Sequence, residues 1–292
     1  MIVSSAELGM LHVEKSVFAP NSLFAESLPF EFAVGWDLPG GGNPYDSCGR
    51  WSHNKPSDGC LDLEAHSQLH LDGLDHVGQV YVKKRVQTCY RASCPVCYED
   101  WVSDEADKAT YRILEFAKRH KIIHVYASVP VSDYFLEYPK LRAKMYRMIK
   151  KCGIWGGMVM FHPWRQDELT LNWCFSPHFH ILGCGWVYGT GMNYEKSGWV
   201  VGKIEDVGDR DPFSTIRYQL SHCGINEKYH SVTWFGGMNY RFKIAKMPEK
   251  VATCPFCGRD LKPVKWVGLG ENPLEDLKKG GYWLDPGGWE YG

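Results

Sequence analysis

The spacing of apolar side chains predicts three helices, because apolar residues recur three or four positions apart in each of them. Ser103 suits the cap of the first helix, and the acidic residues that follow it favour the positive end of a helix. Pro212 suits the first turn of the third helix, and Gly224 suits the position after its end. The predicted helices span residues 103–119, 140–152 and 212–223.

Runs of β-branched and aromatic residues predict strands before and between these helices. The strands span residues 79–86, 122–129, 157–162, 175–182 and 199–207. Pro163 is expected to end the third strand, and the loop of about a dozen residues after it lets the third and fourth strands pair antiparallel. Helices and strands do not alternate as they do around a parallel sheet. The order therefore predicts an α+β fold with a central antiparallel sheet of about five strands flanked by helices.

Composition divides the chain into four segments. Residues 1–47 are rich in Gly, Pro, Asn and Ser, which predicts an irregular leader. Residues 48–101 are rich in Cys and His, which predicts a small zinc-binding module packed on the core. Residues 102–247 contain most of the predicted helices and strands and form the predicted core. Residues 248–292 contain a further zinc knuckle and a tail.

The chain has no apolar run of the ~20 residues that cross a bilayer, and it lacks the basic-then-apolar start of a signal peptide. We therefore expect an intracellular, cytoplasmic protein with no membrane partner. In that compartment, paired cysteines are typical of metal sites and not of disulfides.

Two Cys-x-x-Cys pairs among the 11 cysteines have the form of zinc knuckles. The first pair, Cys94 and Cys97, is preceded by Cys89, so that this group needs one more ligand. We assign Cys48 as that ligand, in competition with Cys60 and a nearby histidine. The histidines of this segment are His53, His66, His70 and His76.

The second pair, Cys254 and Cys257, is followed by a glycine that lets the turn close. It supplies half of a structural zinc site. His222, Cys223 and His230 are the candidates to complete that site.

His178 and His180 flank a single apolar residue, Phe179, in a predicted strand. Side chains alternate along a strand, so both imidazoles point to one face about 7 Å apart and can share a metal ion. The competing interpretation is two ordinary sheet histidines. With 12 histidines in 292 residues, a His-x-His pair arises easily by chance.

Tyr218 and His222 lie four residues apart on the third predicted helix. They share the face opposite the apolar residues Phe213, Ile216 and Leu220. A tyrosine in that position is exposed or faces a cleft.

The order of these motifs resembles the HUH endonucleases, and within them the rolling-circle replication initiators of archaeal plasmids and viruses. The resemblance covers residues 48–258 and rests mainly on the order of the motifs. The similar stretches are Gly156-Gly157-Met158-Val159-Met160-Phe161-His162-Pro163-Trp164-Arg165, Ser176-Pro177-His178-Phe179-His180, Tyr218-Gln219-Leu220-Ser221-His222, and Cys89-x4-Cys94-Pro-Val-Cys97 followed by Trp101.

The resemblance implies a metal site and a nucleophile. His178 and His180, with His162 in the position of the third ligand, would hold one divalent ion, Mn²⁺ or Mg²⁺. The alternative for His162 is a turn residue before a proline. Tyr218 would attack a DNA phosphodiester, forming a 5′-phosphotyrosine link and leaving a 3′-hydroxyl for a polymerase. The implied partners are single-stranded DNA at a replication origin and host replication proteins.

The sequence departs from the resemblance near the tyrosine. Many relatives have a lysine three residues after it, whereas this chain has Ser221 there and His222 next. His222 would either take over the lysine's work, by positioning DNA or moving a proton, or ligate zinc. Only one tyrosine lies in this helix, so termination would need water or a second subunit.

The formal net charge of −1 gives no bulk attraction to nucleic acid, so any contact with DNA must be local. The second predicted helix is strongly basic, and a solvated helix face is the alternative to a phosphate-binding surface. The predicted DNA contacts are Lys144, Arg147, Lys150, Lys151 and Arg165.

These features predict a metal-dependent tyrosine endonuclease that nicks and rejoins single-stranded DNA at a specific site to start rolling-circle replication. One alternative is a zinc-module DNA-binding protein without chemistry. Others are a transposase or relaxase of the same superfamily and a metal-dependent hydrolase of small molecules.

Overall fold

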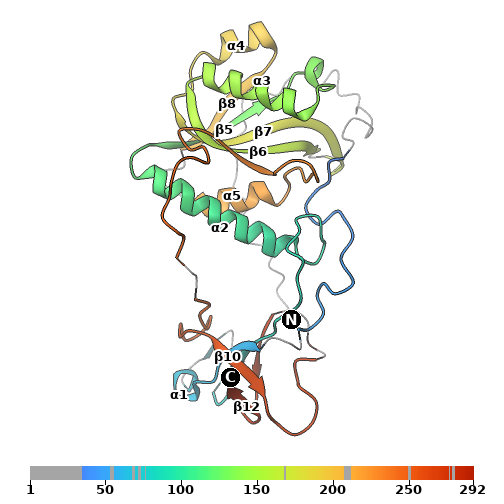
Figure 1. The fold of residues 1–292 in the computed structure, drawn as a ribbon, viewed down its shortest axis with the longest axis vertical. Helices are drawn as coiled ribbons and strands as arrows, with labels where there is room; N and C mark the ends of the chain where they lie inside the picture. Colours follow the sequence, from blue (N-terminus) through green and yellow to red (C-terminus); the bar gives the residue numbers. More distant parts are fainter. Residues whose placement is uncertain are drawn as a thin grey trace.

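The computed structural model describes residues 35–52, 56–67, 70–71, 74–75, 77–167, 169–206, 212–248, 251–275, 277 and 280–292. Most of the predicted leader, together with the candidate ligands His53 and His76, lies outside these residues. The described chain forms two lobes, each built on a five-stranded antiparallel sheet (Figure 1). The α+β fold class is thereby confirmed.

The large lobe (residues 98–236) contains a central five-stranded sheet with strand order β8-β5-β7-β6-β9, of which the last strand was not predicted. Every neighbouring pair in it is antiparallel, including the predicted pairing of β6 with β7. The strands are β5 (Ile122–Ser128), β6 (Ile154–Gln166), β7 (Trp173–Gly185), β8 (Val200–Asp206) and β9 (Val232–Gly236).

Helices cover both faces of this sheet (Figure 1). One face packs on α2 (Tyr98–Ala117) and α5 (Pro212–Leu220), through the even-numbered residues Met158 and Met160 of β6. The other face packs on α3 (Tyr138–Lys151) through the odd-numbered Val159 and Phe161. The turn η2 (Val131–Asp133) precedes α3, and α4 (Thr190–Ser197) lies beside it.

The alternation of the strands decides on which face each histidine lies. His178 and His180 of β7 have the same parity as Leu182, which packs on the α2 and α5 side. His162 shares the parity of Met158 and Met160. All three predicted ligands therefore lie on the face that α5 covers.

Several predicted boundaries are wrong, and three of them have a clear physical reason. Helix α2 begins at Tyr98 and not at Ser103, because the turn at Cys94 runs directly into the helix with hydrogen bonds from the amides of Cys97 and Tyr98 to the Cys94 carbonyl. Strand β6 continues past Pro163, where a bulge between His162 and Trp164 absorbs the residue that cannot donate to the ladder.

The third wrong boundary is the end of α5. The helix ends at Leu220, before the predicted glycine. Gly224 instead donates its amide to the carbonyl of Phe161, 2.7 Å away. This contact fixes the segment after α5 against strand β6.

The small lobe (residues 57–83 and 251–292) contains a second sheet, in which only one strand, β4 (Val80–Lys83), matches a predicted strand, that of residues 79–86. Its strand order is β11-β4-β1-β10-β12, so strands from both ends of the described chain share one sheet. Its elements are β1 (Ser57–Cys60), α1 (Leu63–His66), β2 (His70–Leu71), β3 (Leu74–Asp75), β4 (Val80–Lys83), β10 (Lys262–Trp266), β11 (Gly281–Leu284) and β12 (Trp289–Tyr291). No described helix is long and apolar enough to cross a bilayer.

Candidate metal centre

His162, His178 and His180 come together on the sheet face beneath α5. The register of β6 and β7 places His162 directly opposite His178, and His180 lies two residues further along the same face. One ring nitrogen of each imidazole lies within 4.8 Å of the others, so the group could hold a metal ion. The structure thus brings the three predicted ligands into one cluster.

His162 gives the clearest indication that this cluster fits a metal ion. Its side chain is fully buried, and neither ring nitrogen has a hydrogen-bond partner among the described residues. A buried polar nitrogen without a partner costs about 1–3 kcal/mol. A metal ion shared with His178 and His180 would satisfy one of these nitrogens, so the site fits a divalent cation.

Hydrogen bonds orient the other two imidazoles for the same purpose. His178 Nδ1 lies 2.8 Å from the carbonyl oxygen of Ser176, so Nδ1 carries the proton and Nε2 keeps its lone pair. His180 Nδ1 lies 3.0 Å from Nε2 of His124. When His180 donates in this contact, its Nε2 is also free to bind a metal. Such outer contacts fix the tautomer of a metal-ligating histidine.

His124 was not predicted as a site residue. It lies in β5 and is buried on the same sheet face as the three ligands. The sequence contains a signal for it, because His124 has the even parity that turns away from Ile123 and Val125, residues of the opposite core. Only the pairing of β5 with β7 identifies His180 as its partner.

Burial keeps these histidines neutral. It lowers the pKa of His178 to about 4 and the pKa of His162 and His180 well below the usual value, and neighbouring imidazoles add to the effect on all three. A neutral imidazole is the form that binds metal. At neutral pH the cluster therefore presents lone pairs and no positive charge.

Tyr218 and His222 continue the cluster toward the surface. The ring centroid of His222 lies 4.6 Å from that of His162 and 4.8 Å from that of Tyr218. Tyr218 is 66% exposed and lines a cavity of about 330 Å³ between α5 and the start of α2. The predicted pair thus lies together, with His222 between the buried histidines and an accessible tyrosine. Burial lowers the pKa of His222.

The predicted DNA contacts lie on two different surfaces. Arg165 is exposed at the end of β6, close enough that its charge lowers the pKa of both His178 and His180 after the larger effect of burial. Lys144, Arg147, Lys150 and Lys151 lie on α3, across the sheet from the histidines (Figure 1). Lys144 donates to the buried carboxylate of Asp133 at 2.6 Å. The basic helix is therefore separate from the candidate metal centre.

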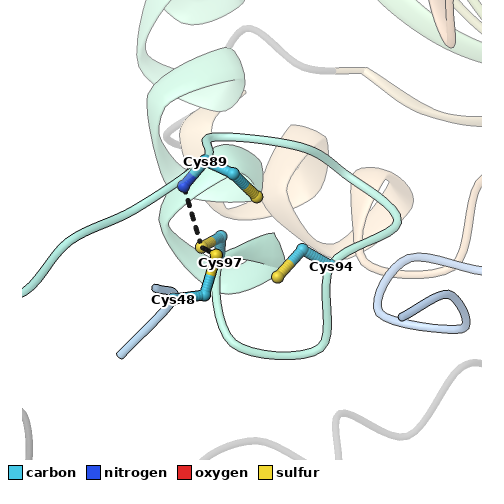
Figure 2. A group of neighbouring side chains, drawn as sticks. All are labelled: Cys48, Cys89, Cys94 and Cys97. Atoms are coloured by element: carbon cyan, nitrogen blue, oxygen red, sulfur yellow. Dashed lines mark hydrogen bonds between the residues drawn. The ribbon is translucent and has the colours of Figure 1, made fainter. Parts of the chain in front are cut away.

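Cys48, Cys89, Cys94 and Cys97 form a four-cysteine cluster before α2, and their sulfur atoms lie within 4.8 Å of one another (Figure 2). Cys97 Sγ is 3.7 Å from Cys48 Sγ and accepts a hydrogen bond from the Cys89 amide. Burial alone would raise the pKa of Cys89, but hydrogen bonds from Arg91 bring it to about 6. The structure brings Cys48 to this group instead of Cys60. Four cysteines are a complete ligand set for a structural zinc ion, so this cluster could hold zinc.

Cys254 and Cys257 meet partners that we did not predict. Cys60 and His66 complete their group, with ligand atoms within 4.8 Å of one another. His222 faces the histidine cluster, Cys223 is buried in the core beneath α5, and neither these two nor His230 belongs to the group. The physical reason is the small lobe, in which Cys60 at the end of β1 and His66 at the end of α1 lie beside the C-terminal knuckle. Sequence spacing contains no signal for that pairing.

Comparison of the chain with models of protein families, with characterised proteins and with solved structures finds no match.

Proposed function

We propose that this protein is a metal-dependent tyrosine endonuclease that nicks single-stranded DNA and rejoins it. The observation that carries the proposal is the shared face of three neutral histidines beneath a helix that presents an exposed tyrosine. Three imidazoles with open coordination positions are typical of a catalytic metal, whereas closed four-ligand groups are typical of structural zinc.

The histidine cluster and Arg165 would bind the scissile phosphate. His162, His178 and His180 would hold a divalent ion, which when bound would supply Lewis-acid chemistry toward a scissile phosphate. Arg165 adds positive charge at the edge of the same cluster. Together these groups would bind the phosphodiester and reduce its repulsion of a nucleophile.

Tyr218 supplies the nucleophile. Its hydroxyl oxygen would bond to phosphorus, the bond from phosphorus to the 3′-oxygen would break, and the DNA 5′-end would remain attached to the tyrosine. Rejoining reverses these steps, because the phosphoester bond is conserved in the intermediate. The exposure of Tyr218 gives a DNA strand access to it.

His222 would move the proton. A free phenol has a pKa of about 10, so Tyr218 needs a base to attack at neutral pH. His222 is neutral because burial lowers its pKa, and its ring contacts that of Tyr218. It would accept the phenolic proton and deliver it to the departing 3′-oxygen. The electron pair of the broken bond from phosphorus to oxygen stays on the 3′-oxygen, which takes up this proton.

We further propose that this nicking starts rolling-circle replication of a plasmid or virus. The nick leaves a free 3′-hydroxyl, which a polymerase of the host can extend, while the covalent link retains the energy needed for rejoining. The arrangement of His162, His178, His180 and Tyr218 agrees with the resemblance to rolling-circle initiators.

Detection of a covalent adduct between the protein and DNA tests this proposal. The protein is incubated with Mn²⁺ and a pool of single-stranded oligonucleotides that have a random centre and a label at the 3′-end, since the 3′ fragment carries the phosphotyrosine. We expect a labelled band that survives denaturation. Tyr218→Phe should abolish it, whereas Tyr194→Phe, which changes an exposed tyrosine on α4, should leave it unchanged.

The other outcomes separate the alternative functions. Cleavage without an adduct would indicate a metal-dependent hydrolase, and binding of the pool without cleavage would indicate a DNA-binding protein without chemistry. An adduct that persists in Tyr218→Phe would show that a different residue is the nucleophile.

A further inference from the structure

Cys60, His66, Cys254 and Cys257 come from opposite ends of the described chain, 188 to 197 residues apart, yet meet in one cluster. Three of the four side chains are buried. All eleven cysteines of the protein are described, and none forms a disulfide. Three thiols and an imidazole that lie together in a small lobe, most of them buried and none in a disulfide, are typical ligands of a metal ion.

We propose that these four residues hold a structural zinc ion that joins the two ends of the chain into one lobe. This inference does not depend on the proposed nicking activity.

The separations within the cluster fit tetrahedral zinc. Zn–S bonds of about 2.3 Å and Zn–N bonds of about 2.0 Å give tetrahedral edges of about 3.8 Å between two sulfurs and about 3.5 Å between sulfur and nitrogen. Cys60 Sγ lies 3.7 Å from Cys257 Sγ, and Cys254 Sγ lies 3.6 Å from His66 Nε2. A disulfide would instead require about 2 Å between sulfurs.

The surroundings of His66 support the same conclusion. Its Nδ1 lies 3.1 Å from the carbonyl oxygen of Gln79, so Nδ1 donates and the lone pair of Nε2 points toward Cys254. His66 is fully buried at the end of α1, where water cannot satisfy that lone pair. The hydrogen bond therefore fixes the tautomer that binds metal.

The backbone around Cys254 has the form of a metal knuckle. The Gly258 amide donates to the Cys254 carbonyl at 2.9 Å, and Gly258 adopts a φ of +72°, which glycine tolerates best. The Cys254 amide donates to the Arg259 carbonyl. This tight turn brings Cys254 and Cys257 to the same side, ready to bind one ion.

The position of the cluster indicates which parts of the chain the zinc ion would join. Strand β1 ends at Cys60 and pairs with β10, which begins shortly after the knuckle. The apolar core of this lobe consists of only a few buried residues, among them Val80, Val82 and Trp289. A lobe of this size is marginal without a cross-link. Zinc would hold together the two chain segments that the large lobe separates.

The zinc content of the full-length protein is measured by mass spectrometry after extensive dialysis against metal-free buffer, which removes loosely bound metal. Cys60→Ser and His66→Ala should each hold one zinc ion fewer than the unsubstituted chain. Cys174→Ser, which changes a cysteine outside both clusters, should keep the full count. His66→Cys should also keep it, because a thiolate replaces the imidazole as fourth ligand.

The double variant Cys48→Ser with Cys60→Ser should lose two zinc ions, one from each cluster. Loss of exactly one ion in each single variant separates a lost site from a misfolded protein, since misfolding releases both. The inference is overturned if Cys60→Ser and His66→Ala retain the full count, or if Cys174→Ser loses as much zinc as they do.

Discussion

His124 contacts His180, one of the three proposed metal ligands, and would position its imidazole. Its Nε2 lies 3.0 Å from His180 Nδ1, on the side of the imidazole that faces away from the proposed ion. Loss of such an outer contact weakens metal binding about 10–100-fold. We predict this loss of Mn²⁺ affinity for His124→Phe, measured by calorimetry. His120→Phe, which changes an exposed histidine at the end of α2, should bind Mn²⁺ as before. Equal affinities in the two variants would contradict the positioning role.

The depressed pKa values of the buried histidines predict acid sensitivity of the protein without metal in this cluster. The unfolded chain takes up protons on His178 below about pH 6.5, whereas the folded chain resists until about pH 4 because the site is buried. Folding stability should therefore fall as the pH falls through this window, by about 1 kcal/mol per histidine between about pH 7.5 and about pH 5.5.

Urea unfolding at the two pH values, after EDTA dialysis, tests this prediction. The His178→Gln variant should lose less stability on acidification than the unsubstituted protein, by about 1 kcal/mol. Saturating Mn²⁺ should raise stability at neutral pH, because an ion that binds only the folded state stabilises it. A pH dependence that is identical in both proteins would argue against a buried neutral His178.

At the scale of elements, the close approach of β6 to β7 depends on glycine. A Cβ at Gly157 would lie 2.6 Å from the carbonyl oxygen of Leu182 and 2.7 Å from Cα of Gly183. These are backbone atoms and cannot move aside without shifting the pair of strands that carries all three histidines. We predict that Gly157→Ala lowers the free energy of unfolding by about 1–3 kcal/mol.

The matched control is Gly191→Ala in α4, where a Cβ would meet no atom of the described residues within 4 Å. There alanine should leave stability unchanged or raise it by up to about 1 kcal/mol. Urea unfolding of the two variants at neutral pH provides the measurement. Equal stabilities of Gly157→Ala and Gly191→Ala would show that β6 can shift without cost.

At the scale of the whole molecule, the two lobes differ in what stabilises them. The large lobe has two extensive apolar clusters, one on each face of its sheet. The small lobe has one small cluster and the proposed zinc. We predict that a strong zinc chelator unfolds the small lobe before the large lobe, because the folding free energy of the small lobe would come largely from the metal.

Hydrogen exchange followed by mass spectrometry measures this difference. Amides of β1, β4 and β10 should lose protection on chelation, while those of β5, β6 and β7 keep theirs. Added zinc should restore protection in the small lobe. Simultaneous loss in both lobes would mean that the zinc sites stabilise the molecule as a whole.

The sequence by itself determined the local elements and the chemistry they carry. Strand β5, helix α3 and the antiparallel pairing of β6 with β7 agree with the periodicity, because apolar spacing reflects burial on one face. The alternation of a strand predicted that His178 and His180 share a face. These are short-range properties, because they depend on residues that lie close together in the sequence.

Only the tertiary structure decided which residues from distant segments meet. Register places His162 opposite His178, and a one-residue slip would turn it to the other face. The pairing of β1 with β10 brings Cys60 and His66 to Cys254 and Cys257, where spacing had favoured other partners. The strand bulge at Pro163 likewise follows from the sheet around it. Long-range pairing depends on how whole elements pack, and neither periodicity nor motif spacing contains that information.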